Sequence, residues 1–377
     1  MVNNMVIKDF DRSVQRISSY FEGQKGKVTI GIDGYIDEVW NMVKRTNGSA
    51  HFEFYQKVED FANVLRGVGA GGIGIECVRK RRSCGGFTAN TGRAIGRLGV
   101  DVIHIAMYGK DQIDPVFQEF GKKCKIISIG APAVSQNYEF KDGKIMLSSS
   151  QEIMNLDWER LTSSLSNEVL SNVYGDADII GFGYWSNMMA FDDMVAKICE
   201  NFIIPGKSGK TTRMFFDFAD LRKRGKHDLM HTLGVLGVLN KKVPMTLSLN
   251  EHEAGILFNL MSKDFDWRMP SESVEVDIEF VRSKIELDEL IVHTPYFAVG
   301  ATATEGVATV LQNYCEDPVA TTGAGDNFNG GYIAASVSYG ELSLSERLLV
   351  GNATTGFYIR YGYPPTADEV IKEIKGG

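Results

Sequence analysis

The sequence predicts an α/β fold, in which a doubly wound, mostly parallel sheet is the central element. Two observations lead to this fold class. Short runs of apolar and β-branched residues alternate with helix-like segments along most of the 377 residues, and such alternation is typical of β-α-β units with parallel strands. Several of the strand-like runs also end in polar residues. Because open α/β sheets bind ligands at the carboxyl ends of their strands, we expect the chemistry to lie along one edge of the sheet.

The expected elements follow one another at regular intervals. The first strand covers residues 27–33, whose sequence KVTIGID has the pattern of a buried strand with a polar end. The later elements are strands at 102–107, 178–182, 213–218, 245–250 and 290–294, and helices at 89–98, 191–202 and 328–337.

Three segments depart from this alternation. Residues 39–82 contain aromatic and β-branched pieces, a helix-like stretch at 56–65 and a glycine-rich run. Residues 134–149 have the pattern of a hairpin whose turn is Lys-Asp-Gly-Lys at 141–144. Residues 262–279 are polar and acidic, and we expect a surface loop there.

The composition argues against several classes of protein. Apolar residues make up 44% and charged residues 23% of the chain, as in a soluble globular protein with a sizeable core. The net charge of −8 argues against binding nucleic acid through a basic surface. No apolar run approaches the ~18 residues of a membrane span, and the N-terminal residues lack the pattern of a secretion signal. The five cysteines are scattered, so neither a zinc site nor a disulfide framework is indicated, and we expect a cytoplasmic protein without nucleic-acid or membrane partners.

The most informative motif is TTGAGDNF at residues 321–328. The small residues Gly323, Ala324 and Gly325 leave backbone amides open at a tight turn, where a phosphate group could approach closely. A small-faced helix follows, and a helix N-terminus offers unpaired N–H groups and partial positive charge to a phosphoryl group. Asp326, at the mouth of this helix, could accept a proton from an attacking hydroxyl. An anion-binding turn beside a base is the minimum apparatus of a small-molecule kinase; the alternative is a glycine-rich turn before a core helix.

This motif resembles a signature of the ribokinase-like, or PfkB, carbohydrate kinases. Their late signature is Asp-Thr-x-Gly-Ala-Gly-Asp-x-Phe, which residues 321–328 match except at its first position, where this chain has Ala320. The early signature of the family, Gly-Gly and Asn before a small-faced helix, is matched by Gly85, Gly86 and Asn90. Glycines let the backbone approach a polyol closely, and an Asn amide can bond two adjacent hydroxyls. The resemblance extends over nearly the whole chain.

The resemblance implies an ATP-dependent kinase of a sugar or sugar-like alcohol, with a ribokinase-like sheet and a small β lid over the sugar. The lid would consist of insertions at about 39–82 and 134–149, within a single kinase domain of residues 1–377. Asp326 would deprotonate the acceptor hydroxyl, while the amides of residues 323–325 would stabilise charge on the γ-phosphoryl group. The implied partner is a small sugar or polyol, and free edges of the lid strands could pair two subunits.

Two carboxylates follow the first strand. The family places a carboxylate here that accepts hydrogen bonds from substrate hydroxyls. Asp37 is the first candidate and Asp33 the second, because the spacing around Gly34 is one residue longer than in the family. The alternative is that an Asp at this place caps the following segment.

The resemblance also implies a nucleotide site that binds ATP with Mg²⁺. Asn250 and Glu253 match the Asn-x-x-Glu of the family and lie one helical turn apart, so that both could face the phosphates. Both would help to hold Mg²⁺, Glu253 through water; the alternative is a helix start whose acidic residues are favoured by the helix dipole. Thr294, Thr322 and Asn352 are the further expected contacts of the nucleotide.

The chain departs from the family at two places, and one charged run is ambiguous. Ala320 replaces an Asp that helps relatives to hold an activating monovalent cation, which puts potassium activation in doubt. Pro295 stiffens the nucleotide loop, which usually contains Gly in the family. Residues 79–82, Arg-Lys-Arg-Arg, form either a solvated face or a site for the phosphate of a sugar phosphate. A nucleoside or sugar-phosphate kinase and a catalytically silent sensor of a sugar or nucleotide therefore remain alternatives.

Overall fold

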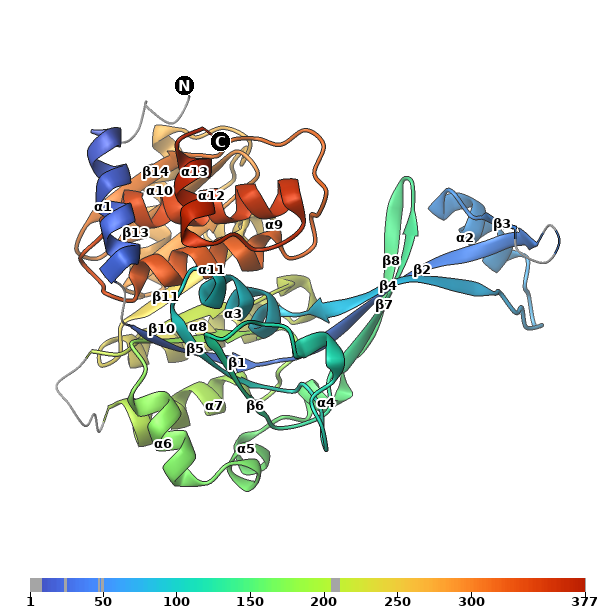
Figure 1. Cartoon of the computed structure of the whole chain (residues 1–377), viewed down its shortest axis with the longest axis horizontal. Helices are drawn as coiled ribbons and strands as arrows, with labels where there is room; N and C mark the ends of the chain where they lie inside the picture. Colours follow the sequence, from blue (N-terminus) through green and yellow to red (C-terminus); the bar gives the residue numbers. More distant parts are fainter. Residues whose placement is uncertain (1–8, 24–25, 47, 49–50, 205–210, 377) are drawn as a thin grey trace.

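A mostly parallel sheet forms the body of the molecule (Figure 1). The computed structural model describes residues 9–23, 26–46, 48, 51–204 and 211–376. Within them the large sheet has nine strands in the order β14-β13-β12-β11-β10-β9-β1-β5-β6. Neighbours from β6 to β12 are parallel, and β13 and β14 continue the sheet in antiparallel fashion. The strands are β1 (Lys27–Ile32), β5 (Asp101–Ala106), β6 (Cys124–Ser128), β9 (Ile179–Gly183), β10 (Arg213–Asp217), β11 (Met245–Asn250), β12 (Glu289–His293), β13 (Phe297–Thr302) and β14 (Gly306–Leu311).

The strand order reverses at β1. Strands β5 and β6 lie on one side of β1, and β9 to β12 lie on the other. In a doubly wound sheet, ligands bind in the crevice at the carboxyl ends of the strands beside such a reversal. Asp33 follows β1 directly and is therefore placed at this crevice. The predicted fold class is confirmed.

Helices cover both faces of the sheet (Figure 1). Successive side chains of a strand point to opposite faces, so that Met214 and Phe216 of β10 join one apolar layer and Phe215 joins the other. The layer with Phe215 includes residues of α1 (Phe10–Gly23), α3 (Phe87–Arg97), α11 (Ala324–Ser336), α12 (Leu344–Tyr361) and α13 (Ala367–Ile374). The opposite layer includes residues of α4 (Gln151–Met154), α5 (Trp158–Ser164), α6 (Asn167–Gly175), α7 (Phe191–Ile198), α8 (Lys226–Asn240), α9 (Glu251–Leu260) and α10 (Glu272–Lys284).

Small residues let α11 pack tightly between α3 and α12. A Cβ at Gly330 would lie 2.5 Å from the Cβ of Ala94 on α3, and a Cβ at Gly331 would lie 2.3 Å from Oγ1 of Thr354 on α12. Such contacts are shorter than van der Waals distance, so both positions require glycine. The small face that the sequence shows thus holds the N-terminus of α11 in a defined place.

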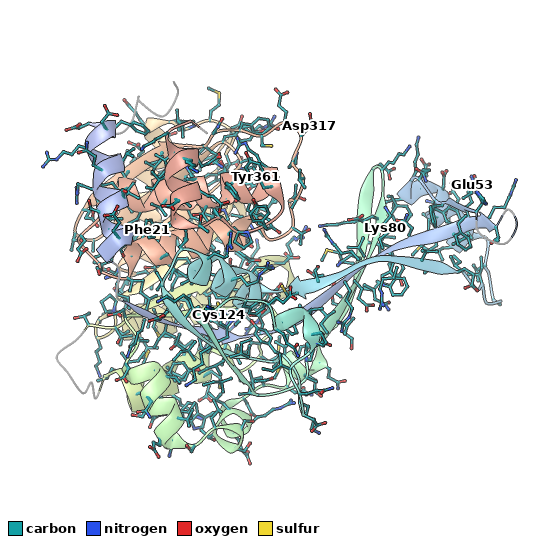
Figure 2. All side chains as sticks on the ribbon, in the orientation of Figure 1. Phe21, Glu53, Lys80, Cys124, Asp317 and Tyr361 are labelled. Carbon is teal, nitrogen blue, oxygen red and sulfur yellow. The ribbon has the colours of Figure 1, made fainter. Side chains whose placement is uncertain are left out.

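The lid is a second sheet that projects from the carboxyl edge of the large one (Figure 1). Its long strand β2 (Tyr35–Thr46) pairs with β4 (Cys77–Gly85), β7 (Ala133–Phe140) and, at its far end, β3 (Phe52–Phe54), while β8 (Gly143–Ser149) pairs with β7. Helix α2 (Val58–Arg66) lies beside β3 at the far end. Figure 2 shows Glu53 at that end and Lys80 nearer to the body of the molecule.

The elements of the lid begin earlier than expected, and one helix was missed. The lid strands start at Tyr35 and end at Gly85, because β2 follows β1 after two residues, whereas we expected an insertion at 39–82. The hairpin expected at 134–149 is confirmed as β7 and β8. The expectation of a surface loop over 262–279 is wrong for its second half, where α10 begins at Glu272. The Ser271 hydroxyl caps this helix by accepting from the Val274 N–H, and buried residues at 274, 278 and 281 form its apolar face.

Candidate active site

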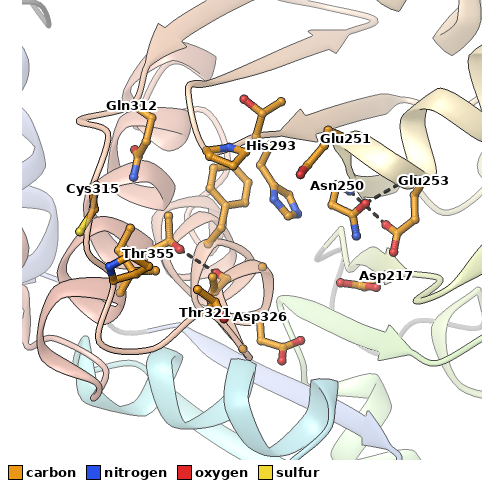
Figure 3. A pocket seen from close by; sticks show the side chains of 18 of the residues that line it. Asp217, Asn250, Glu251, Glu253, His293, Gln312, Cys315, Thr321, Asp326 and Thr355 are labelled. Carbon is orange, nitrogen blue, oxygen red and sulfur yellow. Dashed lines mark hydrogen bonds between the residues drawn. The ribbon is translucent and has the colours of Figure 1, made fainter. Parts of the chain in front are cut away.

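A cavity of about 650 Å³ opens at the carboxyl ends of the strands (Figure 3). Its walls come from the ends of β9 to β12, the first turn of α9, the loop after β14, the first turn of α11 and the C-terminal half of α12. The lining residues are Tyr184, Asp217, Ala219, Asp220, Asn250, Glu251, Glu253, His293, Thr294, Pro295, Gln312, Tyr314, Cys315, Glu316, Pro318, Thr321, Gly323, Ala324, Gly325, Asp326, Phe328, Thr355 and Ile359. The volume suits a drug-sized or nucleotide-sized ligand.

The late motif forms one end of the cavity. Gly323 is the N-cap residue of α11 and has a φ of +87°, which glycine adopts without strain. The turn is held from α12, where the Thr355 hydroxyl donates to the carbonyl of Ala324 at 2.8 Å and the Tyr358 hydroxyl donates to the carbonyl of Thr322 at 2.7 Å. N–H groups in the first turn of a helix have no intrahelical acceptor. The turn that the sequence predicts to bind an anion thus lies at the cavity wall, and its role stays a prediction.

Asp326 lies at the same end of the cavity (Figure 3). Nδ2 of Asn90 donates to Oδ2 of Asp326 at 2.9 Å. Removal from water raises the pKa of Asp326 to about 7, the Asp217 carboxylate adds to the rise, and the Asn90 hydrogen bond opposes it. A general base works best when its pKa is near the operating pH. The structure thus brings together Asn90 from the early motif and Asp326 from the late one.

The pair Gly85-Gly86 makes room for the two expected substrate carboxylates. A Cβ at Gly85 would lie 2.2 Å from Oδ2 of Asp37, and a Cβ at Gly86 would lie 2.0 Å from Oδ2 of Asp33. Gly86 also has a φ of +88° as the N-cap of α3. The glycines are thus required by the carboxylates beside them, a reason that the sequence alone did not reveal.

Asp33 and Asp37 differ in their surroundings. Oδ1 of Asp33 accepts from the N–H of Thr88 at 2.9 Å and from its hydroxyl, whereas Oδ2 is buried without a partner in the described residues. Burial raises the pKa of Asp33 to about 6. Burial also raises the pKa of Asp37, which lies on lid strand β2, against a hydrogen bond from Asn137 and the charges of Lys144 and Arg81. Asp33 is buried and Asp37 half-buried, and neither is among the residues that line the cavity.

Asn250 and Glu253 form a capping box at the start of α9. Oδ1 of Asn250 accepts from the N–H of Glu253 at 3.0 Å, and Oε2 of Glu253 accepts from the N–H of Asn250 at 3.0 Å (Figure 3). Burial raises the pKa of Glu253 well above its usual value, and the charge of Asp217 adds to the rise. Burial likewise raises the pKa of Asp217 to about 6. The carboxyl groups of Asp217 and Glu253 are neighbours, and each opposes ionisation of the other. A divalent cation could bind there in place of their protons.

The other expected nucleotide contacts are distributed differently. Thr294 lines the cavity, and its hydroxyl accepts from the N–H of Phe297 at 3.0 Å. Thr322 lies at the rim, where its Oγ1 accepts a hydrogen bond from Lys144. Asn352 does not line the cavity; its Nδ2 donates to the carbonyl of Val310 at 3.1 Å. The expected nucleotide contact of Asn352 is not supported by this placement, because its side chain is used to join α12 to β14.

The charged run 79–82 is divided between partners. Arg79 donates to Oε1 of Glu38 at 3.0 Å, and Arg82 makes two hydrogen bonds to Asp114 at 2.7 and 2.8 Å. The structure therefore gives no four-residue phosphate clamp.

Tyr184 is a site residue that the sequence reasoning missed. It follows β9 directly, lines the cavity, has a φ of +63° and stacks on Tyr35 of the lid with ring centroids 4.9 Å apart. A non-glycine residue in this region is strained and is held there by its surroundings. Its place at the carboxyl end of the predicted strand 178–182 was the available signal.

The described residues contain neither a membrane-spanning helix nor a cluster of metal-binding side chains. No helix there is long and apolar enough to cross a membrane. Within the same residues, no group of three or more His, Cys, Asp or Glu side chains is arranged as a metal site. A magnesium ion needs few protein ligands because it keeps several waters, so Asp217 and Glu253 remain suitable.

Comparison with known proteins identifies relatives over nearly the whole chain. The sequence model of a family described as prokaryotic ketohexokinase matches residues 7–376. A ketohexokinase of Haloferax volcanii is 30% identical over 351 residues, which cover 92% of this chain and 90% of that protein.

Solved structures of the ribokinase fold resemble the whole chain. A nucleoside kinase of Methanocaldococcus jannaschii, an archaeal member of the ribokinase family, has a TM-score of 0.58 at 17% identity and covers 94% of this chain and 100% of its own. A candidate ribokinase II of Escherichia coli, solved in complex with ATP and Mg²⁺, has a TM-score of 0.61 at 15% identity, with 94% and 100% covered. At these identities the likeness establishes the fold.

Proposed function

The chain belongs to the prokaryotic ketohexokinase family, and from this we propose that it transfers the γ-phosphoryl group of ATP to a hydroxyl of a ketohexose, with Asp326 as the base. ATP-dependent phosphorylation of a sugar follows from membership of the family. The identity of the sugar, the base and the binding residues are the parts that we propose.

The observation that carries the proposal is the position of Asp326 at the N-terminus of α11. Its carboxylate is half-buried, has a pKa raised to about 7, and is oriented by Asn90. The amides of Gly323, Ala324 and Gly325 begin the helix beside it. As the acceptor hydroxyl attacks, Asp326 takes its proton, while the amides stabilise the charge on the phosphoryl oxygens.

We place the triphosphate in the 650 Å³ cavity and the sugar beside it, under the lid. Magnesium, when bound, neutralises charge on the phosphate oxygens, and Asp217, Asn250 and Glu253 would hold it. Asp33 and Asp37 would accept hydrogen bonds from sugar hydroxyls, because each has a carboxylate beside the crevice that is withdrawn from water.

Potassium activation is not part of the proposal, since Ala320 offers no carboxylate to a monovalent cation. Arg79 and Arg82 are paired with Glu38 and Asp114, so these two residues are not free to bind the phosphate of a sugar phosphate.

A coupled assay of ADP release tests the proposal. Ketohexoses, aldohexoses, sugar phosphates and nucleosides are compared at saturating Mg-ATP, with and without potassium, for the wild type and Asp326→Asn. We expect turnover of a ketohexose, independent of potassium, and a loss of about 10²–10⁴-fold in kcat for the variant with ATP affinity retained. A variant within a few-fold of the wild type would exclude Asp326 as the base, and preference for a nucleoside would exclude the substrate class.

Two further parts of the proposal concern assembly and place in the cell. Lid residues Phe52, Leu65, Met146 and Leu147 are each more than 40% exposed, which supports pairing of two subunits through the lid. Light scattering on a size-exclusion column tests this, and a monomer at micromolar concentration would refute it. Because ATP is supplied in the cytoplasm, we place the enzyme there; fractionation of cells is the corresponding test.

A further inference from the structure

The ATP cavity has an unbalanced charge. Six acidic residues line it, namely Asp217, Asp220, Glu251, Glu253, Glu316 and Asp326, whereas no described lining residue is Lys or Arg. The one histidine of the wall, His293, stays neutral because burial lowers its pKa to about 4. A bound triphosphate adds further negative charge, of which magnesium compensates only a part. A kinase needs positive charge near the transferring phosphoryl group, and no described side chain of the wall supplies a full positive charge beside the amides of α11.

Lys144 of the lid is placed to supply this charge. It is the second residue of β8, just after the turn of the β7–β8 hairpin. Its Nζ donates to Oγ1 of Thr322 at 3.2 Å, although the two residues are 178 positions apart in the chain. Thr322 precedes Gly323, the N-cap of the helix whose first amides form the anion-binding turn. The ammonium therefore lies at the rim of the place where the phosphoryl group would pass.

The surroundings leave this ammonium available. Lys144 has no carboxylate within 4 Å among the described residues. The hydroxyl of Thr322 is a neutral acceptor and takes one of the three donors that an ammonium carries. The positive charge of Lys144 also opposes the rise in the pKa of Asp37, so Lys144 lies near the expected sugar carboxylate as well as beside Thr322.

We propose that Lys144 is a catalytic residue delivered by the lid, which contacts the transferring γ-phosphoryl group and so makes turnover depend on lid closure. This inference rests on the proposed function and deepens it. In the transfer, the bond from the γ-phosphorus to the bridging oxygen of ADP breaks, and the bond to the sugar oxygen forms. The proton of the sugar hydroxyl passes to Asp326, and the ammonium group of Lys144 stabilises the charge on the non-bridging oxygens.

Three variants test the proposal kinetically. Lys144→Met removes the charge and keeps the aliphatic stem, Lys144→Arg keeps the charge, and Lys141→Met is the control, in the turn of the same hairpin. We expect Lys144→Met to lower kcat about 10- to 100-fold with the KM of the sugar within about 3-fold, Lys144→Arg to recover part of kcat, and Lys141→Met to match the wild type. A kcat within 3-fold of the wild type, or a change confined to the KM of the sugar, would overturn the proposal. Equal melting temperatures show that the variants are folded.

A binding experiment separates this proposal from the proposed function. The non-hydrolysable ATP analogue AMP-PNP and ADP are titrated with magnesium and fructose present, by calorimetry. Lys144→Met should weaken AMP-PNP about 10-fold and leave ADP unchanged, because only AMP-PNP carries the γ-phosphoryl group. An equal loss for both nucleotides, or for neither, would overturn the role of Lys144. If the wild type phosphorylates no sugar of the panel, the proposed function fails. The comparison of AMP-PNP with ADP then still decides whether Lys144 contacts the γ-phosphoryl group.

Discussion

Replacing Asp326 by Asn should make the protein more stable at neutral pH although it removes the base. The ordinary pKa of an Asp is 3.8, whereas burial and the charge of Asp217 raise the pKa of Asp326 to about 7. The folded state therefore binds a proton more tightly than the unfolded chain does. Below pH 3.8 the carboxyl is protonated in both states and does not change the free energy of unfolding. As the pH rises from 3.8 to about 7, only the unfolded chain loses the proton, and the folded protein becomes less stable.

The size of the effect follows from this shift. One unit of pKa corresponds to ~1.4 kcal/mol, so a rise of roughly three units costs the folded state about 4 kcal/mol at pH 8, as an upper value. At pH 5 the folded carboxyl is protonated while the unfolded one is ionised, and the cost is about 2 kcal/mol. Asn ionises in neither state. The free energy of unfolding of Asp326→Asn should therefore exceed that of the wild type by up to about 4 kcal/mol at pH 8 and about 2 kcal/mol at pH 5.

Thermal unfolding of the ligand-free protein at pH 5 and pH 8 measures this difference. We expect the variant to melt about 5 °C higher at pH 8 and by about half of that at pH 5. Asp317→Asn, which removes an exposed carboxylate of the loop after β14 (Figure 2), is the matched control and should change little at either pH. A variant that melts below the wild type at pH 8, or a difference that does not shrink on acidification, would refute the reasoning.

Three further predictions concern activity and stability. The ratio kcat/KM should fall about tenfold for each pH unit below 7, because only ionised Asp326, with its pKa of about 7, accepts a proton; a flat profile down to pH 5 would argue for another base. Gly86→Ala should destabilise the protein by about 2 kcal/mol or more and raise the KM of the sugar, since its Cβ would lie 2.0 Å from Asp33; wild-type melting and KM would contradict this packing. Arg347→Met should lower the free energy of unfolding by about 3–5 kcal/mol, because it removes the cation that is paired with buried Glu289 at 3.0 Å; urea unfolding measures this change, and a neutral variant would show that the pair contributes nothing.

Local patterns predicted the sheet, and the structure confirms it. Alternating strands and helices indicated the parallel order, and the motif around Asp326 indicated a turn that lies at the cavity wall, while its role in the reaction stays a prediction. Each of these rests on residues that are close in sequence, where spacing and backbone conformation limit the possibilities. The same holds for Asn250 and Glu253, whose spacing correctly indicated that they share one helical turn.

Features that depend on distant contacts were not predictable in the same way. Asn352 was expected at the nucleotide, yet its amide bonds β14, and nothing in the local sequence distinguishes these two partners. Lys144 meets Thr322 across 178 residues, and only the closure of the lid hairpin over the sheet edge creates this contact. Tyr184 was missed because strain at a positive φ is a property of the folded backbone.

Gly85 and Gly86 are required for a different reason from the one that the sequence suggested. From sequence, Gly85 and Gly86 suggested a backbone that a polyol could approach. In the structure, Gly85 leaves space for the carboxylate of Asp37, almost fifty residues earlier in the chain. Gly86 leaves space for the carboxylate of Asp33, more than fifty residues earlier. The two glycines and two carboxylates are thus one unit that joins the lid to the sheet. A larger residue at either glycine would collide with the carboxylate beside it, so Gly85 is required by Asp37 and Gly86 by Asp33.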